Sequence, residues 1–78
     1  MDTFEEIRKV ISTNLNVPLA TISAHSKASD FAEWDSIHHL VLVMEVEQTF
    51  GFNFSLTEIA EFDSVERIVK AVEKRTKA

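Results

Sequence analysis

Hydrophobic residues at the start of the chain recur three and four positions apart, which is the spacing of one face of an α-helix. This apolar stripe consists of Phe4, Ile7, Ile11 and Leu15. Thr3 and Glu6 have the spacing of a capping box, and Asn16 with the nearby proline is typical of a helix end. The pattern therefore predicts a first helix from Thr3 to Leu15.

The C-terminal part of the chain predicts three more helices. The second begins at Asp35 or Ser36 and ends at Gly51, a residue type that often follows a helix directly. Capping boxes open a short third helix over residues 55–61 and a fourth helix at residues 63–66. The expected inward face of the fourth helix comprises Val65, Ile68, Val69 and Val72.

Residues 16–35 show no lasting period and predict a long loop held by apolar anchors. The expected anchors are Val17, Leu19, Ile22, Phe31 and Trp34. A loop of this length in a small domain usually has a function. The expected fold is all-α: a small four-helix bundle of three longer helices and one short helix, with a long loop between the first two.

The second helix carries more apolar residues than one helix face needs. On a helical wheel of 100° per residue, one stripe lies within about 60° of Ile37. Its members are Ile37, Leu40, Val41 and Met44. The opposite stripe comprises His39, Leu42, Val43, Val46 and Phe50. A helix at the edge of a small bundle needs only one stripe facing the core.

The stripe that ends in Phe50 is larger and contains an aromatic side chain, so we expect it to face the core. The stripe from Ile37 to Met44 would then be partly exposed. An exposed apolar patch usually marks a binding surface. The alternative is a central helix that is buried on both sides.

The composition is that of a globular protein, since 45% of the 78 residues are hydrophobic. We expect a single domain over residues 1–78. The chain has no cysteine, which excludes disulfides and thiolate metal sites. The longest apolar run, Leu40 to Met44, is too short to span a membrane, and the N-terminus lacks a signal-peptide pattern. These features predict a soluble, cytoplasmic protein.

The net charge of −5 is distributed unevenly along the chain. Residues 28–66 contain nine acidic residues and neither lysine nor arginine. An acidic segment of this length repels the phosphates of nucleic acids and steers the protein toward basic partner surfaces. We therefore expect neither a nucleic acid nor a membrane as partner. The alternative is an acidic surface that only aids solubility.

Ser36 stands where the second helix is expected to begin. Free backbone N–H groups and the positive end of the helix dipole favour a phosphate ester at this place. The alternative is an ordinary capping serine, because serine is a common residue at the start of a helix.

The sequence around Ser36 resembles the acyl carrier protein family. Residues 35–37, Asp-Ser-Ile, are similar to the Asp-Ser-Leu signature of these proteins, and Phe31 and Trp34 precede it. The segment LVLVMEVEQTFGF resembles the second helix of the family, and FSLTEIAEFDSVERIVKAV resembles its third and fourth helices. The resemblance covers essentially the whole chain.

The resemblance implies that a separate transferase esterifies Ser36 with 4′-phosphopantetheine from coenzyme A. The thiol of this group would hold an acyl group as a thioester, and the chain itself would be no enzyme. Asp35 would help the transferase to position its metal and coenzyme A. The expected partner-binding residues are Ile37, Leu40, Val41, Met44 and Glu47. The expected partners of this monomer are a phosphopantetheinyl transferase and acyl-activating, acyltransferase or ketosynthase-type enzymes.

The resemblance further implies a space inside the bundle into which an acyl chain can fold. The residues expected to border it are His39, Leu42, Val43, Val46, Phe50, Phe54, Phe62 and Ile68. Two features differ from the carriers of fatty-acid synthesis, which usually have acidic residues in place of His38 and Val41. The Trp-Asp-Ser sequence resembles carriers of polyketide or other specialised acyl pathways.

Other functions remain as alternatives. An aminoacyl or peptidyl carrier uses the same prosthetic group, but its serine is usually flanked by glycines. An unmodified helical adaptor would use the exposed stripe to bind a partner helix. We expect no metal site, because His38 and His39 diverge by about 100° on a helix. A Ser-His-Asp hydrolase would need an oxyanion hole that this chain is too short to build.

Overall fold

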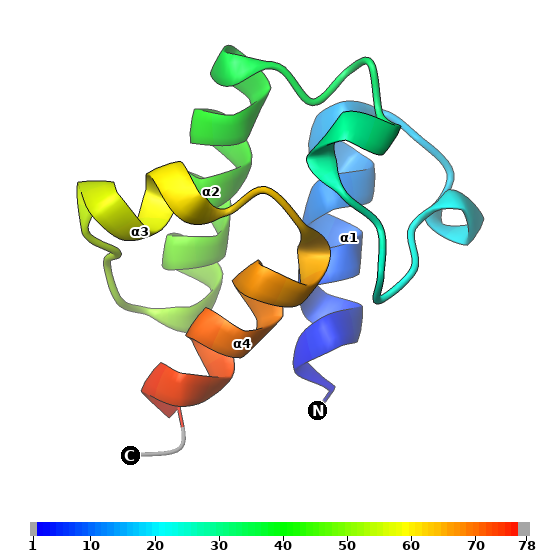
Figure 1. Ribbon diagram of the computed structural model, residues 1–78. Helices are drawn as coiled ribbons and strands as arrows, with labels where there is room; N and C mark the ends of the chain where they lie inside the picture. Colours follow the sequence, from blue (N-terminus) through cyan, green and yellow to red (C-terminus); the bar gives the residue numbers. More distant parts are fainter. Residues whose placement is uncertain (1, 77–78) are drawn as a thin grey trace.

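The computed structural model describes residues 2–76, and these form helices without any β-strand (Figure 1). The helices are α1 (Thr3–Leu15), α2 (Ser36–Phe50), α3 (Leu56–Glu61) and α4 (Val65–Thr76). Two short 3-10 helices, η1 (Leu19–Thr21) and η2 (Ala28–Asp30), lie between α1 and α2. The predicted all-α fold with three longer helices and one short helix is therefore confirmed. None of the helices within residues 2–76 is long and apolar enough to cross a lipid bilayer.

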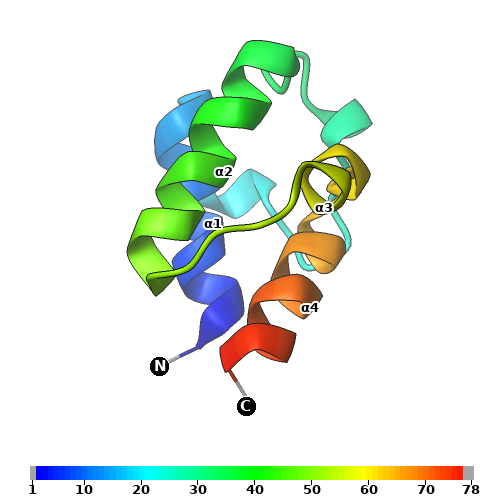
Figure 2. The ribbon, with the colours of Figure 1, turned by 90° about the vertical axis from the view of Figure 1, so that its left-hand side faces the viewer.

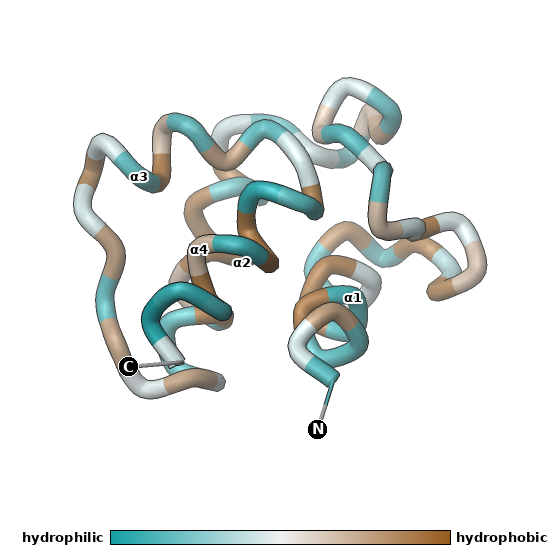
Figure 3. The backbone as a smooth tube through the Cα atoms, turned by 60° about the horizontal axis from the view of Figure 1, so that its bottom comes forward, coloured by the Kyte–Doolittle hydropathy of each residue, from teal (hydrophilic) through white to brown (hydrophobic). Residues whose placement is uncertain are grey.

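The core lies between α1, α2 and α4. Helix α1 contacts both of the other long helices, and α4 ends near the start of α1 (Figures 1 and 2). The side chains exposed by less than 2% are Ile7, Ile11, Ile22, Leu42, Val43, Val46, Val65, Ile68 and Val72. Burying a side chain of this size contributes about 1.5–3 kcal/mol to folding. Hydropathy alternates along α1 and α4, as expected for helices with a single apolar face (Figure 3).

The starts of the helices differ in part from the prediction. Helix α1 is capped by Asp2, whose carboxylate accepts a hydrogen bond from the Phe4 backbone N–H at 3.1 Å. The predicted capping box of Thr3 and Glu6 is wrong, because Thr3 already has helical geometry and the chain turns one residue earlier. The predicted box of Ser55 and Glu58 in α3 is confirmed in both directions.

The start of α4 also uses a different residue from the predicted one. The Ser64 hydroxyl accepts a hydrogen bond from the Arg67 backbone N–H at 3.2 Å. The predicted box of Asp63 and Glu66 is therefore wrong. Asp63 instead pairs with the Arg67 side chain at 3.3 Å, and Glu66 pairs with Lys70 at 3.1 Å.

The long connection between α1 and α2 is held against the segment that precedes α4. The Ala28 N–H donates to the Asp63 carbonyl at 2.9 Å, and the Val65 N–H donates to the Ser26 carbonyl at 3.0 Å. Of the predicted anchors, Ile22 and Trp34 are buried, whereas Val17 and Phe31 pack partly against the core. The prediction for Leu19 is wrong, because its side chain is 41% exposed. Its carbonyl oxygen accepts hydrogen bonds from the Arg8 guanidinium and from the Ile22 backbone N–H. These bonds fix the chain that leads into Ser36.

Candidate functional site at the start of α2

Ser36 is the first residue of α2, and its side chain is exposed. The cap of the helix is Asp35, whose carboxylate accepts a hydrogen bond from the His38 backbone N–H at 2.9 Å. The alternative in which Ser36 itself is the capping residue is therefore wrong. Within residues 2–76 the Ser36 hydroxyl makes no hydrogen bond, so it is free to react.

Asp35 places a negative charge directly beside this hydroxyl. The pKa of Asp35 is held below its usual value, first by the hydrogen bond from the His38 backbone N–H and then by that from the His38 ring. The Nδ1 atom of His38 lies 2.8 Å from the carboxylate. Because a lowered pKa keeps the carboxylate ionised, Asp35 remains an oxygen ligand and acceptor next to Ser36 at neutral pH.

An open groove of about 510 Å³ begins at Ser36 and runs between the start of α2 and α3. The apolar part of its wall is formed by Trp34, Leu40, Leu56, Ile59 and Phe62, together with the ring of His39. Residues from the loop before α2, from α2 and from α3 thus line one groove. The groove gives an organic group bound to Ser36 an apolar surface on which to lie.

His39 connects the two sides of this groove. The Trp34 indole Nε1–H donates to His39 Nδ1 at 2.9 Å, and His39 Nε2 lies 2.8 Å from the Ile59 carbonyl oxygen. An indole can only donate and a carbonyl can only accept, so this geometry puts the imidazole proton on Nε2. The Trp34 and His39 rings also stack, with 6.1 Å between their centres.

The residues predicted to border an acyl chain divide into two groups. Only His39 and Phe62 line the groove. Leu42, Val43, Val46, Phe54 and Ile68 are buried in the packed core, and Phe50 packs partly against it. The prediction missed the groove residues Trp34, Leu40, Leu56 and Ile59. The apolar spacing of Leu56 and Ile59 in the third helix and Phe62 directly after it was the signal that could have found part of this wall.

The second apolar stripe of α2 is exposed, as the helical wheel predicts. The exposed fractions are 73% for Ile37, 53% for Leu40, 48% for Val41 and 58% for Met44. The alternative of a helix buried on both sides is therefore wrong. We call these four residues the outer face of α2, and they begin one residue after Ser36. Their exposure is unusual for side chains of this kind clustered on one helix.

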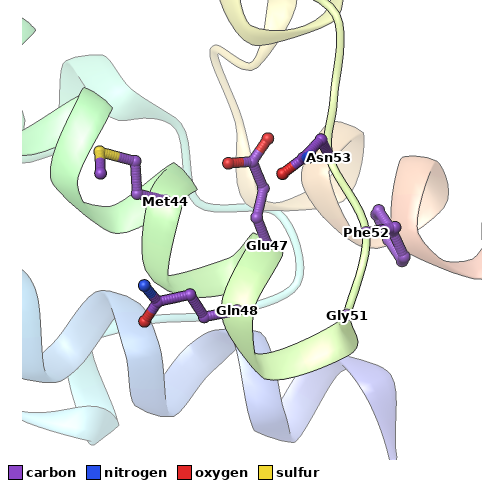
Figure 4. Close-up of a pocket in the computed structure, with 6 residues that line it drawn as sticks. All are labelled: Met44, Glu47, Gln48, Gly51, Phe52 and Asn53. Carbon is purple, nitrogen blue, oxygen red and sulfur yellow. The ribbon is translucent and has the colours of Figure 1, made fainter.

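Glu47, which was predicted to bind partners, has an internal contact. Its carboxylate accepts a hydrogen bond from the Phe54 backbone N–H at 2.7 Å. In Figure 4 the carboxylate extends toward the loop that carries Asn53. Glu47, Met44 and Phe52 are among the residues that line a hollow of about 320 Å³. Glu47 therefore holds the α2–α3 loop in place, whatever it contributes to binding.

The two neighbouring histidines point to different partners. His38 contacts Asp35, whereas His39 contacts Trp34 and Ile59. Their rings diverge as the helical spacing predicts. Within the part of the chain that the structure describes, no three histidine, aspartate or glutamate side chains come together in a way that could hold a metal ion.

Comparison with known families adds an independent observation. Residues 5–72 match the family model described as "Phosphopantetheine attachment site". The match includes Ser36, the groove and the outer face of α2, and it covers most of the chain.

Comparison with curated proteins gives the same class. The chain is 37% identical over 73 residues to the acyl carrier protein of Onion yellows phytoplasma, covering 94% of this chain and 96% of the relative. It is 36% identical over 73 residues, with the same coverage, to the acyl carrier protein of Aster yellows witches'-broom phytoplasma. The acyl carrier protein of Campylobacter hominis is 30% identical over 77 residues, which are 99% of this chain and 98% of the relative.

The chain belongs to the phosphopantetheine-binding family of acyl carrier proteins. Membership implies a covalently attached 4′-phosphopantetheine group and interaction with a phosphopantetheinyl transferase and acyl-handling enzymes. Acyl carrier proteins are carriers and not catalysts. The residues at the start of α2 fit such a group, because a free hydroxyl lies at the positive end of a helix and beside an apolar groove.

Proposed function

We propose that residues 1–78 form a single carrier domain in which Ser36 is the attachment point of 4′-phosphopantetheine. The observation that supports this most strongly is the exposed Ser36 hydroxyl, which lacks a hydrogen bond within residues 2–76 because Asp35 has taken the capping position. The hydroxyl is accessible to a transferase and has no internal contact to lose.

The attachment reaction uses the Ser36 oxygen as nucleophile. Ser36 Oγ forms a bond to the phosphorus nearest the pantetheine of coenzyme A, and the pyrophosphate bond breaks. Adenosine 3′,5′-bisphosphate leaves, and the hydroxyl proton passes to a base of the transferase. The first backbone N–H groups of α2 stabilise the phosphodiester, since the helix dipole favours negative charge there. The group supplies the terminal thiol that binds acyl intermediates as thioesters.

Asp35 has two roles in this proposal. Its carboxylate begins α2 by capping the helix, and it stays ionised because its pKa is lowered by the contacts with His38. An ionised carboxylate beside the reacting hydroxyl suits a hard divalent cation brought by the transferase with coenzyme A. Asp35 therefore positions the metal and the donor relative to Ser36.

The outer face of α2 receives the partner enzymes. Its four apolar side chains lie on the first turns after Ser36, so an enzyme that docks on them has the attached group within reach. The partners are the phosphopantetheinyl transferase and then acyl-activating, acyltransferase or ketosynthase-type enzymes. Glu47 belongs to the same docking surface, and its hydrogen bond with the Phe54 N–H also holds the α2–α3 loop beside it.

The pathway is suggested by the charge of the docking surface. The ring of His38 is paired with Asp35, and Val41 is apolar, so neither adds negative charge to α2. A docking surface with fewer acids fits partners that are less basic. We propose that the carrier works as a cytoplasmic monomer, where coenzyme A is supplied, in a specialised acyl pathway such as polyketide synthesis, with fatty-acid synthesis as the second candidate.

The test is intact-mass spectrometry after incubation with coenzyme A and a phosphopantetheinyl transferase of broad specificity. We expect the wild-type protein to gain the mass of one phosphopantetheine group and Ser36→Ala to gain nothing. Ser29→Ala is the matched control, because Ser29 is also exposed and should leave the gain unchanged. A gain that persists in Ser36→Ala, or none in the wild type, would contradict the proposal and leave an unmodified adaptor.

A second experiment separates acyl from aminoacyl loading. The phosphopantetheine-bearing protein is offered to acyl-activating and to aminoacyl-activating enzymes, and the mass of the product is measured. We expect acyl groups to be accepted. Loading with amino acids alone would instead identify an aminoacyl or peptidyl carrier.

A further inference from the structure

We propose that His39 is a positioning residue for the transfer of phosphopantetheine to Ser36. Its imidazole fixes the first turn of α2, which carries the serine, to the loop before α2 and to α3. The inference rests on the proposed attachment at Ser36. It adds a residue that lies outside the Asp-Ser-Ile sequence and that acts on the reaction through the place of the serine.

The first turn of α2 has little contact with the core. The side chains from Asp35 to Val41 are exposed or half-buried, and Leu42 is the first buried residue of the helix. Most of the stability of a helix in a protein comes from the packing of its apolar face, so a turn without buried side chains frays easily. Ser36 therefore lies on a turn that the core does not hold in place.

His39 supplies the contacts that this turn otherwise lacks. Its Nδ1 accepts a hydrogen bond from the Trp34 indole N–H at 2.9 Å, and its Nε2–H donates to the Ile59 carbonyl oxygen at 2.8 Å. Within residues 2–76, these are the only hydrogen bonds that the side chains of residues 35–41 make outside their own segment. One imidazole thus joins the turn to two other elements.

Both partners of His39 are themselves held in place. Trp34 is only 8% exposed, and the Ile59 side chain packs partly against the core. The Ile59 carbonyl oxygen also accepts a hydrogen bond from the Phe62 backbone N–H at 3.2 Å. Because Trp34 precedes Ser36 and His39 follows it, the bond between their side chains fixes the serine from both sides.

This arrangement matters for the reaction because docking and attachment use different parts of α2. The outer face extends to Met44, where the opposite side of the helix is buried, whereas Ser36 lies at the loosely packed end. An enzyme docked on that face meets the hydroxyl correctly only if the first turn keeps its place on the helix. A displacement of about 1 Å can slow a reaction about a hundredfold. We therefore expect His39 to affect the transfer step more than docking.

The experiment measures kcat and KM for loading of the unmodified protein by a transferase of broad specificity with coenzyme A in excess, together with the melting temperature. His39→Ala should lower kcat by about tenfold and leave the KM for the carrier unchanged. His39→Gln retains one donor and one acceptor, so it should restore most of kcat. His25→Ala is the control, because His25 is exposed in the connection between α1 and α2 and should load at the wild-type rate.

Two further measurements test the hydrogen bonds themselves. Trp34 is the single tryptophan of the chain, so its indole N–H gives one signal in a nitrogen–hydrogen correlation NMR spectrum. This N–H should exchange with water faster in His39→Ala than in the wild type or His39→Gln. Trp34→Phe keeps an aromatic ring without the donor, so it should also lower kcat. Adding it to His39→Ala should cause no further loss, since both changes break the same bond.

The outcomes separate this inference from the attachment on which it rests. Failure of the wild-type protein to load contradicts the attachment at Ser36 and says nothing against the contacts of His39. When the wild type loads, a folded His39→Ala protein with an unchanged kcat, or with a loss confined to KM, would overturn the inference. A His39→Gln protein as slow as His39→Ala, or additive losses in the double variant, would overturn it as well. If His39→Ala does not fold, an unchanged kcat in Trp34→Phe counts equally against it.

Discussion

The two faces of α2 carry side chains of the same kind but differ in what covers them. On the inner face Leu42 and Val46 are completely buried against the other helices, whereas on the outer face Leu40 and Met44 are more than half exposed. Leu40 and Leu42 are identical in chemistry and only two positions apart. Their difference arises from the arrangement of α1 and α4, which cover the inner face only.

This difference assigns separate roles to the two faces. The inner face stabilises the bundle, because its burial removes apolar area from water. The outer face contributes little to folding, so its apolar character needs another explanation. Its position beside Ser36 supports the proposed docking of enzymes that act on the attached group. Matched substitutions on the two faces can test the division directly.

The largest change in the free energy of unfolding is expected when a leucine on the inner face is shortened to alanine. Leu42→Ala should lower the free energy of unfolding by about 2–5 kcal/mol, because it leaves a cavity in a packed core. Leu40→Ala, its matched control on the outer face, should change the free energy by only about 0.5 kcal/mol. Urea unfolding followed by circular dichroism measures both. Equal losses in the two variants would remove the distinction between the faces.

A smaller effect is expected from replacing valine by threonine, which keeps the shape and adds a hydroxyl. Val46→Thr should destabilise the fold by about 1–3 kcal/mol, because the hydroxyl is taken out of water at a completely buried position. Val41→Thr on the outer face should be nearly neutral, since its hydroxyl stays in water. Thermal melting of the two variants provides the comparison, and a neutral Val46→Thr would indicate that water reaches the inner face.

The smallest change in stability is expected from a substitution of Asp35, the capping residue that precedes both faces of α2. Its pKa is lower in the folded protein than the ordinary value of 3.8, mainly through the hydrogen bond from the His38 backbone N–H. The ionised carboxylate therefore stabilises the fold above the unfolded pKa, and this stabilisation is lost as the pH falls through the folded pKa. Asp35→Asn retains a good capping residue but has no charge to lose.

Urea unfolding of the wild type and Asp35→Asn at neutral pH and below pH 3.8 tests this prediction. We expect the wild type to be slightly more stable at neutral pH and the two proteins to converge at acid pH. A difference that grows on acidification would show that the carboxylate is unfavourable in the folded state.

Most of the helical framework could be predicted from the sequence. The bounds of α1 agree with the prediction because its stripe from Phe4 to Leu15 is unbroken. The end of α2 follows from Gly51, whose φ of 81° lies in the left-handed region that glycine adopts without strain. The two faces of α2 also followed from helical spacing alone. In each case the pattern that allowed the prediction lies within a few helical turns of the sequence.

The capping residues were harder to predict because several polar side chains compete at each helix start. Asp2 rather than Thr3 caps α1, and Ser64 rather than Asp63 caps α4. The direction from which the chain enters the helix decides which oxygen reaches a free N–H group. That direction is set by contacts such as the one between Ala28 and Asp63, which are distant in sequence.

The groove at Ser36 could not be predicted from periodicity. It exists because Trp34, His39 and Ile59 come together from the loop before α2, from α2 and from α3. The helical wheel placed His39 on the core side but gave no information about its partners. As a result, the predicted acyl-chain residues were mostly those of the closed core.

The most direct measurement of the central claim is the rate of phosphopantetheine loading on Met44→Glu, determined together with its melting temperature. Met44 lies on the outer face and is 58% exposed, so the added charge should leave melting nearly unchanged. The loading rate should fall by about tenfold, which corresponds to about 1.4 kcal/mol of lost docking. Thr13→Glu, on an exposed position of α1, adds the same charge and should load at the wild-type rate. A Met44→Glu protein that melts as the wild type and loads just as fast would contradict the account.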